Sequence, residues 1–348
     1  MEAAEVRGGR EETLGAAILV LGAVAVAVAG LGPIAMVAIR GFTPYGHVVD
    51  GLTASSTGAL LLVAIGMGAG AIAAGAATFR SMPTKPSRER AISGAILGVH
   101  AVTLAALLLW FRSGDPERFA FHFLNFEKLS GYGFAFLRGA KNTVLLAFVG
   151  EGGGVILGLV LAILVLSKRA VTRAPARAYI NFFRGTPLIW QLSIFYFGFA
   201  LGLGLHLSAY NSAMIVFALN TGAYAAEVFR AGIQSIERGQ MEAARSLGMS
   251  YLQAMRHAIV PQAIRRVIPP LMNEFVILIK DTSLIVVLGL LDRELDLYSL
   301  ARQGYSSTFN ATFYVAAAAG YLAVTLPLIR AVNAVERRLR SGLVGVGA

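Results

Sequence analysis

The stretch EAARSLGMSYLQAMRHAIVP, residues 242–261, is a charged, helix-like segment between two long apolar runs. Gly248 predicts the end of one helix, because glycine readily adopts the left-handed conformation that closes many helices. Ser250 and Gln253 have the S-x-x-Q spacing of a capping box, which starts a second helix. Pro261 ends that helix or begins the next element. The segment is therefore predicted as two short helices with a bend at Gly248.

One face of this segment is apolar at helical spacing. Positions three or four residues apart share a helix face, and the positions that recur in this way are Met241, Ala244, Gly248, Leu252, Met255 and Ile259. The charged residues lie mostly on other faces. Two interpretations follow from the residues alone. The segment is either a rigid projection presented to a partner, or an amphipathic helix on the bilayer whose basic residues face anionic lipid.

The composition indicates a multi-pass membrane protein. Hydrophobic residues make up 56% of the 348 residues and charged residues only 14%, whereas a soluble domain has about 25% charged residues. The 39 glycines suit close helix packing in lipid. Three pairs at small-x-x-x-small spacing are predicted to pack helices together: Gly66/Gly70, Gly154/Gly158 and Gly198/Gly202. The chain has no cysteine, which excludes disulfides and thiolate metal sites.

The predicted fold class is all-α, with about eight transmembrane helices. A spanning helix needs about 20 mostly apolar residues, and the segments that qualify are 14–38, 58–79, 91–111, 142–167, 187–205, 208–229, 267–290 and 311–332. Three parts are predicted: 1–111 with three extra spans, an external aromatic-rich connection at 112–138, and a five-helix core at 139–340 with a loop at about 235–262. The role of residues 1–111 is left open.

The positive charge of the chain fits a membrane topology. The formal net charge is +11, and Lys and Arg concentrate on the side of the layout that holds both termini. The positive-inside rule places that side in the cytoplasm. The charge therefore calls for the lipid bilayer as a partner and for no nucleic acid.

The opening stretch resembles the EAA motif of ABC importer permeases, which reads E-A-A, three residues, G, nine residues and I-x-L-P. Ala258 and Val260 depart from the usual Ile and Leu but remain apolar. The resemblance implies that this loop docks on a cytoplasmic ATPase. The residues implied in ATPase coupling are Glu242, Ala243, Ala244, Arg245, Gly248, Ser250, Arg256 and Pro261.

Further motifs resemble permeases of the polar amino acid uptake group. They are YINFFRGTPLIWQL (179–192), AYAAEVFRAGI (223–233), NEFVILIKDTSL (273–284) and the N-T-V-L-L run that begins at Asn142. The resemblance covers about residues 135–340. It implies a bacterial inner-membrane importer for an amino acid substrate, with a cytoplasmic ABC ATPase dimer, a second permease chain (the same or different) and an external solute-binding protein.

The chain lacks the chemistry of an enzyme. It has no Gly-Lys dipeptide and therefore no P-loop, so ATP and Mg²⁺ are expected to be used by a separate ATPase subunit. Neither a nucleophile elbow nor a zinc-protease motif is present. We therefore expect this chain to have no catalytic residues and to bind no cofactor or metal.

Polar residues within the predicted spans are candidates for a substrate pathway, because they are costly in lipid and usually face a path or a bundle interior. The candidates are Gln191, Asn220, Tyr224, Lys280, Asp281, Thr282 and Ser283. Lys280 and Asp281 point about 100° apart on a helix and do not easily pair with each other. Each residue either contacts substrate or forms a structural ion pair with another helix.

A different class of transporter is the alternative. An ion-gradient-driven secondary amino acid transporter or channel would explain buried charges such as Glu151, Lys280 and Asp281. It would leave the EAA spacing unexplained, and no inverted repeat of the kind found in such folds is visible. The identity of the transported amino acid is left open by the sequence.

Overall fold

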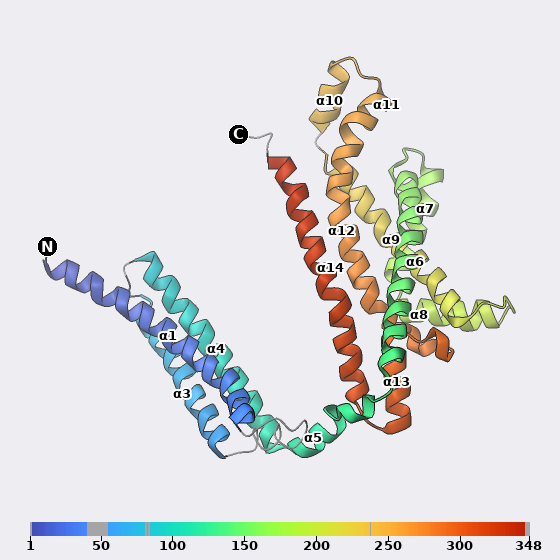
Figure 1. Ribbon diagram of the computed structural model, residues 1–348. Coiled ribbons are helices and arrows are strands. Elements are labelled where there is room, and N and C mark those ends of the chain that lie inside the picture. Colours follow the sequence, from blue (N-terminus) through green and yellow to red (C-terminus); the bar gives the residue numbers. More distant parts are fainter. Residues whose placement is uncertain (1, 40–54, 81, 83, 237, 345–348) are drawn as a thin grey trace. The chain divides into compact units, whose positions relative to one another are not determined.

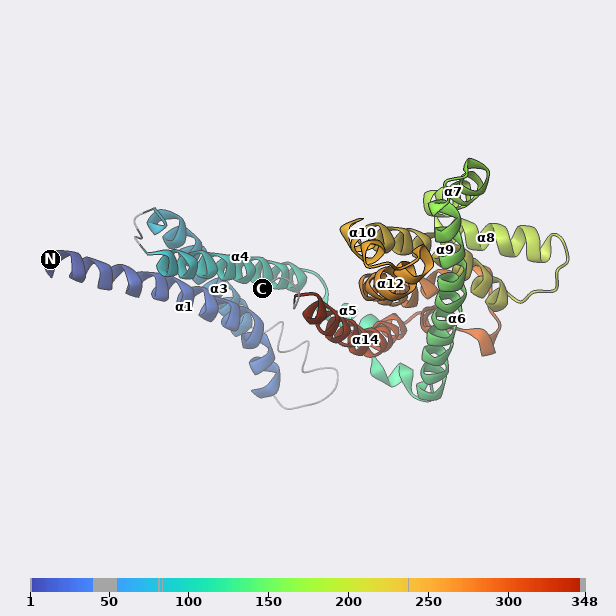
Figure 2. The same cartoon turned by 90° about the horizontal axis from the view of Figure 1, so that it is seen from above.

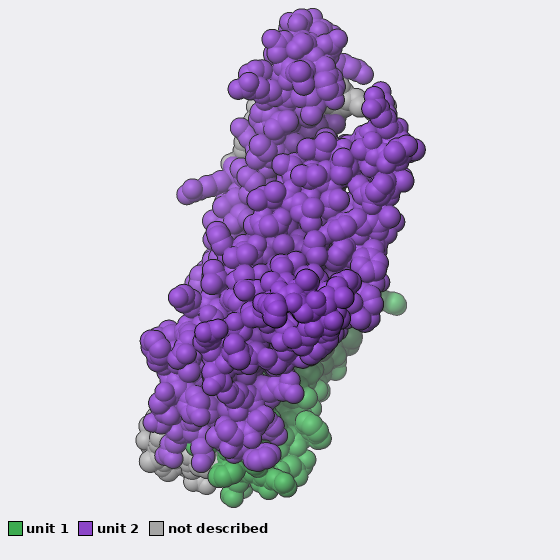
Figure 3. Space-filling model, turned by 90° about the vertical axis from the view of Figure 1, so that its right-hand side faces the viewer, with its two compact units in different colours: residues 1–125 green, residues 126–348 purple. Residues whose placement is uncertain are grey.

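The computed structural model describes residues 2–39, 55–80, 82, 84–236 and 238–344, and these residues form helices and their connections without any strand (Figure 1). The chain divides into two compact units, residues 1–125 and 126–348 (Figure 3). The boundary between them falls inside the predicted connection at 112–138. Residues 40–54 of the predicted N-terminal part lie outside the described residues.

The first unit is a bundle of three long helices. They are α1 (Glu2–Ile39), α3 (Ser55–Thr78) and α4 (Lys85–Ser113), followed by the short helix α5 (Pro116–Phe123). Helices α1 and α3 both lie along α4 (Figures 1 and 2). The side chain of Thr84 caps α4, because its Oγ1 accepts a hydrogen bond from the Ser87 amide at 3.4 Å.

Glycines bring the helices of the first unit into backbone contact. A Cβ on Gly22 would collide with the carbonyl oxygen of Gly94 on α4, and a Cβ on Gly68 would lie 2.8 Å from the carbonyl oxygen of Gly98. The predicted packing pair Gly66/Gly70 is only half confirmed: a Cβ on Gly70 would lie 3.6 Å from the Leu21 side chain on α1, whereas a Cβ on Gly66 would meet nothing within 4 Å. Glycine is so frequent in this chain that spacing alone does not identify the face that packs.

The second unit contains the remaining helices. Its first half comprises the 3-10 helix η1 (Phe126–Leu129), α6 (Gly133–Leu166), α7 (Ala170–Gly185), α8 (Leu188–Ser193), the π-helix η2 (Ile194–Leu201) and α9 (Ala209–Gln234). Its second half comprises α10 (Arg238–Ser246), α11 (Tyr251–Ala254), the π-helix η3 (Met255–Ile259), α12 (Val260–Asp281), the 3-10 helices η4 (Thr282–Leu288) and η5 (Asp292–Glu294), α13 (Leu297–Thr308) and α14 (Thr312–Val344).

Helices α6 and α9 form the central pair of this unit. A Cβ on Gly154 would lie 2.5 Å from the Thr221 Cβ, and one on Gly158 would lie 2.6 Å from the Ala225 Cβ. The predicted packing role of Gly154 and Gly158 is therefore confirmed. The predicted pair at Gly198 is wrong, since a Cβ there would meet nothing within 4 Å. Helices α12 and α14 pack beside this central pair.

Six helices of the described residues are long and apolar enough to cross a membrane. They lie at Thr13–Ile34, Ser55–Thr78, Lys85–Ser113, Gly133–Leu166, Ala209–Gln234 and Thr312–Leu339. The other two predicted spans are not single long α-helices in the structure. The span predicted at 187–205 corresponds to a shorter apolar helix at Leu188–Leu201. The span predicted at 267–290 begins within α12 and continues as the 3-10 helix η4.

Candidate coupling loop and transport pathway

The loop that carries the E-A-A sequence begins with α10, and a Schellman motif ends this helix. The Gly248 amide donates to the Arg245 carbonyl at 3.0 Å, and the Met249 amide donates to the Ala244 carbonyl at 3.2 Å. Gly248 has a φ of 85°, which a residue with a Cβ rarely adopts. The predicted left-handed helix end at Gly248 is therefore confirmed.

The capping box that follows is also confirmed. The Ser250 amide donates to Gln253 Oε1 at 2.8 Å, and the Gln253 amide donates to Ser250 Oγ at 3.3 Å. The predicted second short helix begins there as α11 (Tyr251–Ala254), and the chain then stays helical through η3 and α12 to Asp281. Of the two roles predicted for Pro261, the second is confirmed: it lies at the start of α12, directly after the π-turn of η3, where a missing amide hydrogen costs no helical hydrogen bond.

The loop packs against the rest of the unit on one side and exposes an apolar corner formed by Leu247 and Leu252 on the other. Met241, Met255 and Ile259 pack together under the loop, as their spacing predicts. Leu252 was predicted on this face but is 77% exposed, because the reversal at Gly248 breaks the helical period. Leu247 is 80% exposed beside it. Figure 1 shows α10 and α11 at one tip of the second unit.

The candidate coupling residues lie on α10, on the turn that follows it, and on the helix that begins after that turn. Ala244 is buried, whereas Glu242, Ala243, Arg245, Gly248, Ser250, Arg256 and Pro261 are exposed. The Arg245 side chain donates to the Met249 carbonyl at 3.1 Å and so braces the turn. A rigid turn with exposed apolar and charged side chains suits a protein partner, because little ordering entropy is lost on docking.

The buried amides Gln191 and Asn220 bond to each other across two helices. Gln191 Nε2 donates to the carbonyls of Phe183 and Thr186 at 2.8 and 3.1 Å. Asn220 Nδ2 donates to Gln191 Oε1 at 2.9 Å. These hydrogen bonds connect the non-helical residues between α7 and α8 to α9. In the single chain both candidate pathway residues therefore hold the backbone around Gly185 in place.

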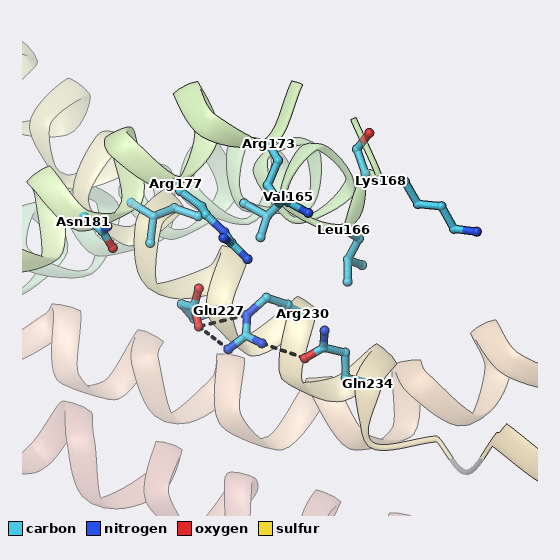
Figure 4. A pocket seen from close by; sticks show the side chains of 11 residues that line it. Val165, Leu166, Lys168, Arg173, Arg177, Asn181, Glu227, Arg230 and Gln234 are labelled. Carbon is cyan, nitrogen blue, oxygen red and sulfur yellow. Dashed lines mark hydrogen bonds and ion pairs between the residues drawn. The ribbon is translucent and has the colours of Figure 1, made fainter. Parts of the chain in front are cut away.

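Tyr224 lies beside a charged cluster at the end of α9. The Arg184 guanidinium is 5.5 Å from the centroid of the Tyr224 ring and 4.0 Å from the Glu227 carboxylate. Arg230 donates to Glu227 Oε2 from Nη2 at 2.6 Å and from Nε at 3.1 Å (Figure 4). Glu227 is thus held within its own chain, as a structural carboxylate would be.

The segment Lys280–Ser283 lies where α12 gives way to η4. Thr282 is buried and its Oγ1 donates to the Ile279 carbonyl at 2.8 Å, while Ser283 Oγ donates to the Lys280 carbonyl at 2.8 Å. In the part of the chain that the structure describes, neither Lys280 nor Asp281 forms an ion pair within 4.0 Å. Lys280 is exposed and Asp281 half-buried, so both charges are free to meet substrate or another chain.

Glu151 lies on α6 at an apolar cavity of about 300 Å³ that includes Phe148, Phe275 and Leu328. Both of its carboxylate oxygens are buried, with no hydrogen-bond partner among the described residues. A buried carboxylate without a partner is costly in a membrane. The residue remains a candidate for a role in transport.

Sequence reasoning missed a polar network at the opposite end of the second unit from α10. The fully buried Asp296 accepts from the Ser299 amide at 3.0 Å and from the Tyr321 hydroxyl at 2.9 Å. Burial raises the pKa of the Asp296 carboxyl. Asn142 Nδ2 donates to the Leu295 carbonyl at 2.9 Å. The Asp-x-x-Ser spacing at 296–299 is a helix N-cap signal that could have revealed part of this network.

Comparisons with known proteins agree with this geometry. A family model for the binding-protein-dependent transport system inner membrane component matches residues 154–341. The probable glutamine ABC transporter permease protein GlnM of Bacillus subtilis (strain 168) is 37% identical over 204 residues, covering 59% of this chain and 93% of that protein. The probable amino-acid ABC transporter permease protein YckA of the same organism is 47% identical over 148 residues, covering 42% of this chain and 65% of that protein, slightly less than two thirds.

A solved structure has the same fold. It is a crystal structure of an amino acid ABC transporter with histidines, at 36% sequence identity and a TM-score of 0.57, covering 62% of this chain and 98% of that chain. The helical fold and the loop define a multi-pass membrane transport subunit. The chain belongs to the family of binding-protein-dependent transport system inner membrane components. It is the permease subunit of an ABC importer and not an enzyme, because the ATPase of such a system is a separate subunit.

Proposed function

We propose that this permease carries a polar amino acid into the cell, driven by ATP and Mg²⁺ on a cytoplasmic ABC ATPase dimer. The rigid corner at Gly248 carries the coupling part of the proposal, because it presents Leu247 and Leu252 on a packed support. The similarity to permeases named for glutamine and for amino acids supports the substrate class.

The remaining partners follow from the same proposal. A second permease chain, identical or different, completes the pathway, and an external solute-binding protein delivers the substrate to the outward segments 112–138 and 291–310. The chain lies in the bacterial inner membrane with both termini in the cytoplasm. Motion of the ATPase moves the loop, and the continuous helix from Tyr251 to Asp281 transmits that motion into the membrane.

The coupling proposal is tested by purifying the full-length chain from native membranes and identifying the co-purifying subunits by mass spectrometry. Gly248→Leu should reduce ATPase recovery strongly, because leucine does not tolerate a φ of 85°. Gly239→Leu is the matched control, since a Cβ at Gly239 would meet nothing within 4 Å. Equal ATPase recovery from both variants would contradict the coupling role. A chain that purifies alone and transports amino acids on an ion gradient would establish the secondary-transporter alternative.

The pathway proposal assigns Lys280 and Asp281, with Ser283, to contacts with the zwitterionic substrate. Gln191, Asn220 and Thr282 shape the same path through the backbone carbonyls to which they donate, and Tyr224 shapes it through its ring contact with Arg184. Lys280→Ala should alter uptake of labelled acidic, basic or amide amino acids while ATPase recovery stays unchanged. Unchanged uptake of all three classes would make Lys280 structural.

The proposed orientation is tested with single cysteines, because the chain has none of its own. Ser246→Cys in α10 should be protected in intact cells from a membrane-impermeant maleimide. Ser130→Cys in the outward connection should react. The reverse pattern would place the termini outside.

A further inference from the structure

A basic cavity of about 580 Å³ lies in the second unit between the end of α6, the helix α7 and the end of α9. Four cationic side chains line it, Lys168, Arg173, Arg177 and Arg230, against the single carboxylate of Glu227. Figure 4 shows the Arg173 and Arg177 side chains directed from α7 toward the Glu227–Arg230 pair, whereas Lys168 points away. None of these residues belongs to the coupling loop or to the candidate pathway.

The positive charge of this cavity is only partly compensated within the chain, because Glu227 is the one carboxylate among its lining residues and it also interacts electrostatically with Arg177. Arg230 and Arg184 already engage Glu227, at 2.6 and 4.0 Å. Among the described residues no hydrogen bond or ion pair within 4.0 Å joins the Arg173 or Arg177 guanidinium to another side chain. Two neighbouring guanidinium groups repel each other unless an anion lies between them. The cavity therefore has the charge of an anion site.

The depth of the cavity indicates the kind of anion. The apolar run of α6 ends at Leu166, and Ser167, Lys168 and Arg169 follow directly. Val165 and Ile180 line the same cavity and are almost fully buried. The cavity thus lies at the level where hydrocarbon gives way to headgroups, and its accessible lining is mainly polar and cationic. A phosphate headgroup matches this lining, with its acyl chains in the adjoining bilayer.

We propose that this cavity binds the phosphate headgroup of an anionic phospholipid from the leaflet on the coupling-loop side. Arg173 and Arg177 hold the phosphate oxygens with charge-assisted hydrogen bonds, for which the planar guanidinium is well suited. Arg230 adds a third positive charge and is itself kept in place by Glu227. Basic pockets between membrane helices bind anionic headgroups in this way.

The test compares lipid retention by the full-length chain, purified with its co-purifying subunits in mixed phosphatidylcholine and phosphatidylglycerol nanodiscs. Arg173→Gln/Arg177→Gln should weaken retention of phosphatidylglycerol about thirtyfold, at about 1 kcal/mol per arginine. Arg330→Gln/Arg337→Gln on α14 removes the same charge from exposed positions and should retain the lipid. Arg173→Lys/Arg177→Lys keeps the charge and should restore part of the retention, even if the glutamine variant folds poorly.

Other outcomes would overturn the proposal. Equal loss of phosphatidylglycerol from the α7 and α14 double variants would show only a general effect of surface charge. Stabilisation of the detergent-solubilised chain by inorganic phosphate, without retention of phosphatidylglycerol, would assign the cavity to a soluble phosphate compound. Loss of a partner subunit from the α7 variant, with lipid retention unchanged, would assign the arginines to a protein contact.

Discussion

The interiors of the two compact units are stabilised by different kinds of interaction. In residues 1–125, α1 and α4 touch through glycine backbones, and the buried polar side chains of the described residues are only Thr57 and Ser87. In residues 126–348, eleven buried polar side chains are found among the described residues, and pairs such as Gln191–Asn220 and Asp296–Tyr321 bond across helices.

This difference shows that helix association and the exact placement of polar side chains depend on different interactions. Close backbone approach gives helix association in lipid without requiring any polar group to be placed exactly. Buried hydrogen bonds, in contrast, fix one geometry, because each broken partner leaves an unsatisfied group. The second unit therefore has the more strictly defined interior, which suits a transport path. Its candidate coupling loop and basic cavity lie at the same end of the unit.

The largest expected effect is the disruption of the glycine contact in the first unit by Gly94→Leu. The new side chain would collide with the backbone of Ile18, and we expect a loss of about 3 kcal/mol in the stability of this unit. The chain has two tryptophans, Trp110 in the first unit and Trp190 in the second. Trp110 fluorescence in a Trp190→Phe background therefore reports unfolding of the first unit alone.

The matched control for this prediction is Gly66→Leu, at a position where a Cβ meets nothing within 4 Å. It should change the Trp110 unfolding transition by less than about 1 kcal/mol. A loss as large as that of Gly94→Leu would show that backbone approach does not distinguish the two positions, and the comparison between the units would fail.

The next largest effect concerns a buried helix cap in the second unit. Asp296→Ala removes the acceptor of the Tyr298 and Ser299 amides and of the Tyr321 hydroxyl, so we expect a loss of about 2 to 3 kcal/mol. Asp115→Ala at the exposed cap of α5 in the first unit should cost only about 0.5 to 1 kcal/mol. Chemical denaturation followed by Trp190 and Trp110 separates the two, and equal losses would contradict the comparison.

A smaller effect is expected for the buried amide pair. Gln191→Leu removes the hydrogen bonds that Gln191 makes with the Phe183 carbonyl and with the Asn220 side-chain amide. We expect a loss of about 2 kcal/mol in the free energy of unfolding. Gln191→Leu/Asn220→Leu should cost about 1 kcal/mol less than the sum of the single changes, because the two residues share one bond. Asn211→Leu at an exposed position of α9 is the control. Strict additivity, measured by Trp190 fluorescence, would show that the pair is not coupled.

The smallest expected effect concerns side-chain helix caps, of which each unit has one in this comparison. Ser250→Ala and Thr84→Ala each remove one side-chain cap, and each should cost about 1 kcal/mol. Hydrogen exchange should quicken only in the first turn of the affected helix. Faster exchange throughout either unit would mean that the cap stabilises the whole interior of that unit. That result would contradict the assignment of its stability to glycine contacts or to buried hydrogen bonds.

Local features of the loop were predictable from the sequence because they depend on neighbouring residues. The left-handed Gly248 and the Ser250–Gln253 capping box are set by side chains within three or four positions of each other. Pro261 begins α12, one of its two predicted roles, but the π-turn that joins this helix to α11 was not predictable from a local pattern. Leu252 misled the prediction, because the helical period does not continue through a chain reversal.

The sequence by itself determined the all-α membrane class, the family and the position of the loop, because these follow from hydropathy and from motifs that are contiguous in the chain. Only the tertiary structure decided which polar residues meet. Gln191 and Asn220 lie 29 residues apart, and Asp296 and Tyr321 lie 25 apart. Arg173 and Arg177 face Arg230 only because α7 folds back against α9. Contacts between helices depend on which faces pack, and no local pattern encodes that choice.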